Sequence, residues 1–264
     1  MLLTIIYLFL FGLIVGSFLN VAILRYNTGR SLAGRSGCFS CRHQLGWTEL
    51  VPVISFLGQG GRCRHCGSKI SWQYPLVELS TGILFALSAW KFYPYFGTVA
   101  FYCVLMAVLI FIVVHDLRHQ IIANEAAYLL IGLAIISPVF RPSDLLPAGG
   151  APAAILYGLL GGFILFAVFF ALWFFSRGRW MGFGDAKLAF ALGALLGPKG
   201  SADAVVVAFW LGALVGLGLI ALSKIRVGKS LHRRYSIKSE VPFAPFLAAG
   251  LLLNLFFGLS VLAF

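Results

Sequence analysis

Residues 152–175 read PAAILYGLLGGFILFAVFFALWFF, a run without a single charged side chain. A helix needs roughly 20 apolar residues to cross a bilayer, so this run predicts a membrane-spanning helix. The rest of the chain has the same character, because 61% of its 264 residues are hydrophobic and only 11% are charged. This composition lies far outside the range of soluble domains. The sequence therefore predicts an all-α membrane protein that crosses the bilayer several times.

Further apolar segments lie on both sides of this run. Together they predict eight membrane-spanning helices, at residues 3–24, 76–90, 98–116, 121–140, 152–175, 183–198, 203–223 and 241–263. The first segment has no Lys or Arg before it and no small-residue cleavage site after it, so we expect a retained helix and not a removed signal peptide. Three parts are predicted: a first helix at residues 1–24, a polar insertion at 25–74 and a helical core at 75–264.

Basic residues gather in alternate loops of this arrangement. Of the 20 Lys and Arg residues, 16 follow the first, third, fifth and seventh segments, three lie in the opposite loops, and Lys187 lies just inside the sixth segment. Cytoplasmic loops carry the excess of Lys and Arg, which predicts an outside N-terminus and a cytoplasmic 25–74 insertion. The net charge of +12 follows from this asymmetry and suits anionic lipid. We expect no nucleic-acid partner.

The 25–74 insertion contains four cysteines in two close pairs. Cys38 and Cys41 are separated by 21 intervening residues from Cys63 and Cys66. This spacing is typical of a tetrahedral zinc site with four thiolate ligands. Two disulfides or a redox pair would use the same residues, but a reducing cytoplasm disfavours disulfides. The sequence predicts a structural Zn²⁺ in a closed, non-catalytic site.

Two aspartates lie at the cytoplasmic ends of apolar segments. Asp116 ends the third segment and Asp185 begins the sixth. An ionisable group at membrane depth is costly and is by default a functional candidate. Two carboxylates within reach of each other can share a proton and activate a water. Helix dipoles favour charge on Asp185 and a proton on Asp116. A simple helix cap at Asp185 is the structural alternative.

Four other residues are candidates for substrate contact. Gly182 and Gly184 flank Asp185 and lack a Cβ, which would let a substrate backbone come close. Lys187 follows Asp185 by two positions, and Glu78 lies near the cytoplasmic end of another segment. Helix capping or pairing with loop arginines would also explain Glu78.

These motifs together resemble the type IV prepilin leader peptidases, also called leader peptidase/N-methyltransferases. The likeness covers GSFLNV at 16–21, the four-cysteine loop with Pro52 and Ser55, YPLVE at 74–78, DLRH at 116–119, GFGDAK at 182–187 and VPFAPF at 241–246. One departure lies after Ile122, where the family usually has proline followed by Asp or Asn. This chain has Ala123 and Asn124 there, so the entry of the fourth segment is expected to differ.

The resemblance implies an intramembrane aspartyl endopeptidase of the GxGD class in the bacterial inner membrane, with Asp116 and Asp185 as its catalytic pair. Such enzymes cut the basic leader from type IV prepilins and type II secretion pseudopilins after a glycine. Members with the cysteine loop commonly also methylate the new N-terminus with S-adenosyl-L-methionine. A proton-coupled transporter that uses the two aspartates as a relay is the alternative. No clear repeat links the two halves of the chain, as it does in many transporters.

Overall fold

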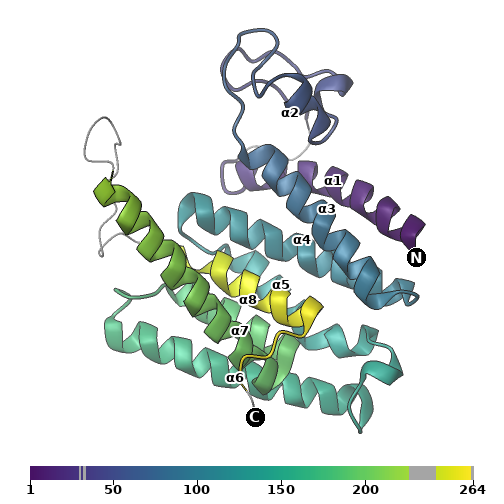
Figure 1. The fold of residues 1–264 in the computed structure, drawn as a ribbon, viewed down its shortest axis with the longest axis vertical. Helices are drawn as coiled ribbons and strands as arrows, with labels where there is room; N and C mark the ends of the chain where they lie inside the picture. Colours follow the sequence, from purple (N-terminus) through teal and green to yellow (C-terminus); the bar gives the residue numbers. More distant parts are fainter. Residues whose placement is uncertain (30, 32–33, 226–241, 263–264) are drawn as a thin grey trace. The chain divides into compact units, whose positions relative to one another are not determined.

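The computed structural model describes residues 1–29, 31, 34–225 and 242–262, and helices are its only regular elements in that part (Figure 1). The longer helices are α1 (Leu2–Arg25), α3 (Gln73–Phe92), α4 (Phe96–His119), α5 (Asn124–Ile136), α6 (Gly150–Ser176), α7 (Phe183–Ile225) and α8 (Ala244–Phe257). Short helical turns are η1 (Trp47–Glu49), α2 (Ile54–Gly58), η2 (Ser137–Phe140) and η3 (Ser143–Leu145). The predicted all-α class is confirmed.

Several of these helices have the length and composition of membrane spans. Four stretches meet both criteria: Leu2–Arg25, Phe96–His119, Ser143–Ser176 and Phe183–Ala221. Two shorter stretches, Asn124–Phe140 and Ala244–Phe257, are also apolar helices. Each of the eight predicted segments overlaps a helix, although the fourth begins only at Asn124 and the eighth is helical over Ala244–Phe257, with residues 241 and 263 outside the described residues. Of the basic residues predicted after the seventh segment, Lys224 falls within α7. The others, Arg226, Lys229, Arg233, Arg234 and Lys238, lie outside the described residues, as does Arg30 of the insertion.

α7 consists of two helical segments joined at Gly197. Gly197 has non-helical angles of φ 73° and ψ 177°, and Pro198 follows it. On α6, Phe170 contacts Phe183 while its neighbour Phe169 contacts Phe209. Residues 183 and 209 therefore lie at a similar level along α6, so the chain turns back at Gly197. This agrees with the two separate segments predicted at 183–198 and 203–223.

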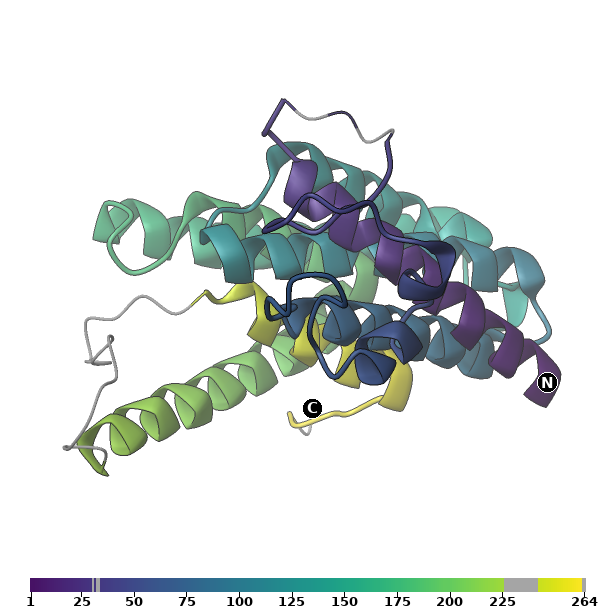
Figure 2. The ribbon, with the colours of Figure 1, turned by 90° about the horizontal axis from the view of Figure 1, so that it is seen from above.

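Contacts divide the chain into two compact units, Met1–Val114 and His115–Phe264. In the first unit, α1 and α3 lie side by side (Figure 2). A Cβ on Gly12 would lie 2.7 Å from Gly82 Cα, and one on Gly16 would lie 2.7 Å from Glu78 Cα. Only glycine permits this approach, as expected for helices that pack in lipid. Residue 12 is level with 82 and residue 16 with 78, so the two helices run antiparallel.

The second unit is built on close contacts of α7 with α6 and α8. A Cβ on Gly158 or Gly193 of this unit would run into the backbone of Ala194 or Gly161, respectively, so α6 and the first segment of α7 pack backbone to backbone. Gly250 of α8 meets Ala204 of the second segment in the same way. α6, α7 and α8 are thus held by glycine contacts that leave little freedom to shift, and α7 carries Asp185.

Candidate active site and cysteine cluster

Asp116 lies in the last turn of α4 and is buried, with 5% of its surface exposed. Its carboxylate accepts a hydrogen bond from the backbone N–H of Ala244, the first residue of α8. The other oxygen, Oδ2, is buried and has no hydrogen-bond partner among the described residues. The Ala244 N–H therefore holds one carboxylate oxygen of Asp116 in place. The other oxygen is available for a hydrogen bond, because a buried polar atom without a partner is costly.

Asp185 lies in the first turn of α7 and is half-buried. Its Oδ2 accepts a hydrogen bond of 3.2 Å from the N–H of Gly182, three residues earlier. The charge of Asp116 acts directly on the Asp185 carboxyl. The two carboxylates predicted from sequence are therefore electrostatic neighbours, and each accepts one backbone N–H.

The two glycines before Asp185 have different surroundings. A Cβ on Gly184 would lie 2.9 Å from Ile122 Cβ, so glycine here allows the 120–123 turn to pack against the start of α7. Gly182 is exposed, and a Cβ there would meet only Asp185 Oδ2 at 3.6 Å and the Gly184 nitrogen at 3.9 Å. Gly184 serves packing inside the protein, whereas Gly182 leaves open space beside a carboxylate.

The turn after α4 is tied back to the helix by a histidine. His115 Nδ1 lies 2.7 Å from the carbonyl oxygen of Ile121, and the His115 ring lies 4.7 Å from that of His119. This contact supports Ile122, which packs on Gly184 next to Asp185. The sequence analysis gave no role to His115 or Ala244. The sequence could have indicated His115, because this residue is next to Asp116. It could not have indicated Ala244, because Ala244 acts through its backbone N–H.

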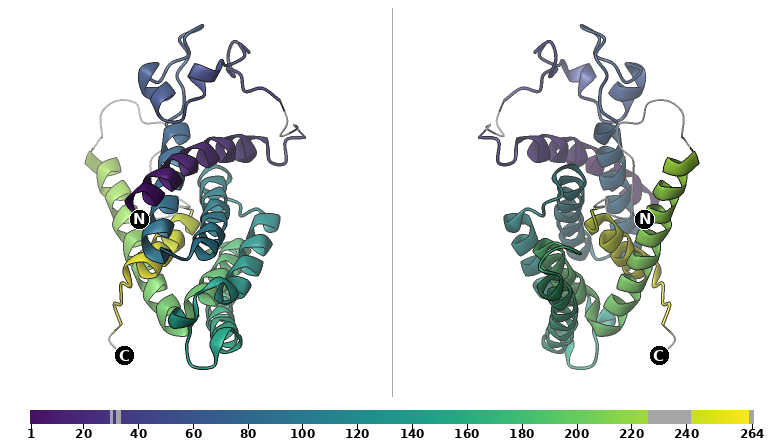
Figure 3. Two further views of the ribbon diagram at one scale, coloured as in Figure 1. Left: turned by 90° about the vertical axis from the view of Figure 1, so that its right-hand side faces the viewer. Right: turned by 90° about the vertical axis from the view of Figure 1, so that its left-hand side faces the viewer.

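The four cysteines gather at one point of the first unit, in the loop that lies beyond the ends of α1 and α3 (Figure 3). Two matching turns carry them: the N–H of Cys38 bonds to the oxygen of His43, and that of Cys63 bonds to the oxygen of Ser68. All four Sγ atoms lie within 4.8 Å of one another, and Cys38 and Cys66 are 3.8 Å apart. Tetrahedral Zn–S bonds of about 2.3 Å place sulfurs about 3.8 Å apart, so the cluster fits zinc.

Hydrogen bonds to the cluster favour thiolates at two positions. The backbone N–H of Cys41, with the Ser68 hydroxyl and the Ser40 N–H, lowers the pKa of the Cys38 thiol to about 5. Ser68 also lowers the pKa of Cys66, whose Sγ lies 3.1 Å from Ser68 Oγ. Ser68 was not singled out from the sequence.

The surroundings of Cys41 act against a thiolate there. The backbone N–H of His43 lowers the pKa of Cys41, but desolvation and the neighbouring thiols outweigh it and raise that pKa to about 11. A bound cation would remove this conflict, because metal ligation deprotonates a coordinating thiol.

Comparison with known proteins covers almost the whole chain. Residues 10–92 match the Bacterial Peptidase A24 N-terminal domain, and residues 103–217 match the Type IV leader peptidase family. A Prepilin leader peptidase/N-methyltransferase of Bacillus subtilis (strain 168) is 34% identical over 97% of this chain and 96% of its own length. The chain belongs to the type IV leader peptidase family. No solved structure matches it.

Other relatives carry the same name. One from Aeromonas salmonicida (strain A449) is 30% identical over 96% of this chain and 90% of its own length, and one from Myxococcus xanthus (strain DK1622) is 35% identical over 84% and 65%. Membership of the type IV leader peptidase family confirms the resemblance seen in the sequence and the enzyme class that it implied. Nothing in these comparisons supports a transporter.

Lys187 makes its contacts next to the family's aspartate motif. Its Nζ donates a 2.7 Å hydrogen bond to Asn124 Oδ1 and lies about 5 Å from the rings of Tyr128 and Phe183. Asn124 begins α5, directly after Ala123, where this chain departs from the usual family sequence. Lys187 therefore joins α5 to α7 close to Asp185, and its predicted contact with substrate stays a prediction.

Glu78 lies in the first unit and is buried within it. Its Oε2 accepts a 2.7 Å hydrogen bond from the backbone N–H of Val53, and its carboxylate also bonds to the Ser17 side chain. Val53 has a left-handed φ of 61°, which is unusual for a β-branched residue. Glu78 thus joins α1, α3 and the start of α2. Its predicted substrate contact also stays a prediction.

Proposed function

We propose that this chain is an intramembrane aspartyl endopeptidase that cleaves the basic leader from type IV prepilins and type II secretion pseudopilins after a glycine. The observation that carries this proposal is the pair of Asp116 and Asp185, in which Asp116 keeps a buried oxygen without a partner next to a second carboxylate. Family membership and the names of the relatives support the substrate class.

In the proposed reaction, one carboxylate of the pair takes a proton from a water whose oxygen attacks the scissile carbonyl carbon. The other carboxyl donates its proton to the carbonyl oxygen, giving a neutral tetrahedral intermediate. When the C–N bond breaks, the amine leaves with a proton from the carboxyl that accepted it, and the other is reprotonated as the new acid forms. The Ala244 N–H keeps one Asp116 oxygen oriented throughout.

Substrate contacts complete this proposal. Gly182 is the best supported, because it is exposed and its Cβ position next to Asp185 is open. Gly184, Lys187 and Glu78 are retained as proposed substrate contacts, although each has a packing or hydrogen-bond role within its own unit.

A prepilin cleavage assay in membranes tests the catalytic pair. Asp116→Asn and Asp185→Asn should each lower the cleavage rate by at least about a thousandfold, since each removes a group that acts in the transition state. Asp144→Asn, in the exposed turn η3, is the matched control and should cleave at the wild-type rate. Wild-type cleavage by either catalytic-site variant would refute the pair.

We also propose that the cysteine cluster holds one structural Zn²⁺ on Cys38, Cys41, Cys63 and Cys66, which would fix the fold of the loop without touching substrate. Metal analysis of the purified protein should give about one zinc per chain. Cys63→Ser should lose it. Cys103→Ser is the control, because Cys103 is buried in α4 away from the cluster. Equal zinc in the two variants would contradict the assignment.

A second proposed activity is methylation of the new N-terminus, for which S-adenosyl-L-methionine would supply the methyl group. The relatives are named N-methyltransferases, which supports it. The described residues form no strand, so the strand-based glycine-rich cofactor fold of soluble methyltransferases is absent from that part of the chain. Mass spectrometry of the cleaved pilin with and without S-adenosyl-L-methionine should show the mass of one added methyl group only with the donor.

The proposed location is the bacterial inner membrane, with the N-terminus outside and the cysteine loop in the cytoplasm. The long apolar helices and the bacterial relatives support a bacterial membrane protein. The distribution of Lys and Arg supports the orientation. A leader rich in basic residues stays on the cytoplasmic side for the same reason, which would bring it to the end of α4 that carries Asp116.

A further inference from the structure

The cysteine loop exposes large apolar side chains that none of the described residues of its unit covers. Trp47 and Leu50, at and just after the short turn η1, and Ile54 and Leu57 in α2 are all exposed, by 80%, 42%, 68% and 66%. Each pair is three residues apart, so its members share one side of a helical turn. We call these four residues the apolar rim of the loop.

The exposure of the rim does not result from poor packing of the loop. Between its members, Phe56 turns the other way and is buried, with its ring 4.8 Å from that of Trp72 and close to Gly61. The N–H of Val53 is held by the buried Glu78. The loop therefore has its own anchored interior, and Ile54 and Leu57 point away from it. Four large apolar side chains of this kind are costly in water and mark an interaction surface.

The position of the loop limits what can cover the rim. α1 ends at Arg25, and α3 begins at Gln73 beside it, because Asn20 of α1 hydrogen-bonds to the carbonyl of Tyr74. Both ends of the loop are thus attached to the same end of an antiparallel helix pair, in which α1 has the length and composition of a membrane span. We therefore expect the loop to start and finish near the membrane surface.

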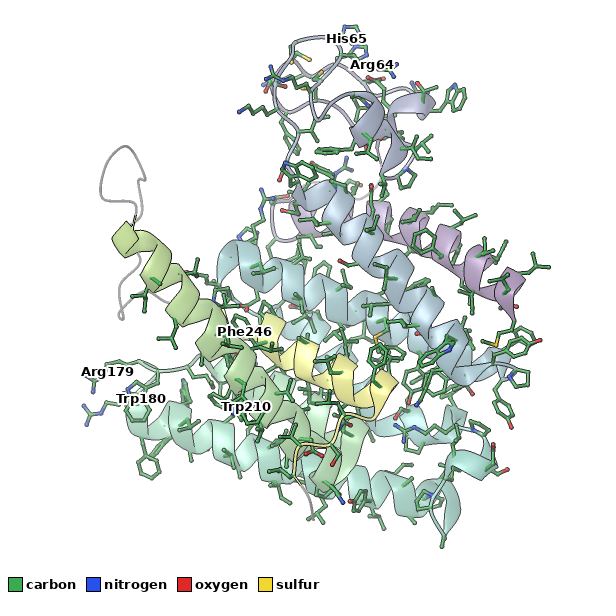
Figure 4. The ribbon with its side chains drawn as sticks, in the orientation of Figure 1. Arg64, His65, Arg179, Trp180, Trp210 and Phe246 are labelled. Atoms are coloured by element: carbon green, nitrogen blue, oxygen red, sulfur yellow. The ribbon has the colours of Figure 1, made fainter. Side chains whose placement is uncertain are left out.

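The charge of the loop also favours contact with the membrane surface. Residues 26–72 contain six basic side chains (Arg30, Arg35, Arg42, Arg62, Arg64 and Lys69) and a single acidic one, Glu49. Arg64 and its neighbour His65 lie at the tip of the loop (Figure 4). Basic side chains close to a bilayer are attracted by anionic headgroups, and tryptophan is enriched at the membrane–water interface.

We propose that the apolar rim inserts into the interfacial layer of the bilayer, and that the excess of basic over acidic side chains in the loop favours a bilayer with anionic headgroups. The lipid contact would hold the cysteine loop down on the membrane beside α1 and α3, which the four cysteines alone do not do. The proposal uses only the first unit of the chain and does not depend on peptidase activity.

Site-specific photocrosslinking of the full-length protein tests this contact. A benzoylphenylalanine at Leu57 places the reactive group on the rim, and one at Thr48, exposed on η1 but polar, is the matched control. A third variant carries it at Arg64 on the tip. The protein is placed in nanodiscs of phosphatidylglycerol and phosphatidylethanolamine, irradiated and weighed intact by mass spectrometry.

We expect phospholipid adducts at Leu57 to exceed those at Thr48 and Arg64 by about tenfold or more. Zinc content equal to that of wild type shows that each variant is folded. Equal lipid adducts at all three positions, no lipid adduct at Leu57, or a covalent dimer of the chain in its place would each overturn the proposal. In a native membrane preparation, a Leu57 adduct with another protein in place of lipid would overturn it as well.

Discussion

At the scale of single residues, Gly184 shows how closely packing and chemistry are joined in this site. Its missing Cβ leaves room for Ile122, which sits in the turn between Asp116 and α5. The same contact holds the start of α7, and therefore Asp185, against that turn. A change of one methyl group at Gly184 consequently acts on the position of both carboxylates.

Gly184→Ala should destabilise the protein and slow cleavage. The new Cβ would lie 2.9 Å from Ile122 Cβ, and Ile122 is buried, so relief requires a backbone shift. Overpacking of this kind typically costs about 1–3 kcal/mol. Thermal unfolding in detergent should show a lower midpoint, and the prepilin cleavage rate should fall.

Gly182→Ala is the matched control for this prediction. The added methyl meets only ordinary contacts beyond 3.4 Å, so the unfolding midpoint should stay close to wild type. A midpoint lowered equally by both substitutions would show that the Ile122 contact does not decide the effect.

The sequence identified Asp116 and Asp185 because carboxylates within apolar runs are rare and costly. The helix dipoles were used to assign the proton to Asp116, at a helix end, and the charge to Asp185, at a helix start. The structure adds the start of α8, whose Ala244 N–H reaches Asp116, so both carboxylates lie at a helix N-terminus. A backbone donor 128 positions away has no signature in the sequence, and the dipole argument alone therefore does not decide which aspartate carries the proton.

At the scale of elements, the start of α5 is where this chain departs from its family. Ala123 precedes the helix with φ −62° and ψ 121°, and the usual family residue here is proline. Proline fixes φ near −65°, so the backbone already has the angle that proline imposes. The residue before it, Ile122, lies in a non-helical stretch, as proline requires.

Ala123→Pro should raise the stability of the protein. The substitution restricts the unfolded chain and leaves the native φ unchanged, which typically adds about 0.4–1 kcal/mol. Ala127→Pro, four residues later, is the control, because it removes the hydrogen bond from the Ala127 N–H to the Ala123 oxygen and should cost about 3 kcal/mol. The unfolding midpoint should rise for Ala123→Pro and fall for Ala127→Pro. A loss of stability in both variants would contradict the prediction.

The helices were predicted best where the hydropathy of the sequence alone determines their position. Two separate segments were predicted at 183–198 and 203–223, and the structure shows the break between them at Gly197. The partners of each helix were harder to predict. Gly12 and Gly16 are small residues four positions apart, a spacing typical of close helix contacts in lipid, but this spacing does not tell that α3 provides the contact.

At the scale of the whole molecule, the contacts group the helices differently from the predicted parts. The sequence assigned residues 75–264 to one core, whereas α3 packs on α1 in a unit that extends to Val114. The predicted core thus remains a functional hypothesis. The two units carry separate chemistry, with the cysteines in the first and both aspartates in the second.

The orientation of the molecule in the membrane gives the last prediction. The excess of Lys and Arg on one set of loops predicts a cytoplasmic cysteine loop and a 141–149 loop on the outer side. A protease site inserted at Gly60, an exposed position in the cysteine loop, should be cut in inverted membrane vesicles and protected in right-side-out vesicles. The same site inserted after the exposed Ala148 should give the opposite result. If both insertions were cut from one side only, the alternation of the helices would be wrong. If each were cut from the side opposite to that expected, the alternation would hold and the orientation would be reversed, which would place Asp116 and Asp185 at the outer face, away from a basic leader kept in the cytoplasm.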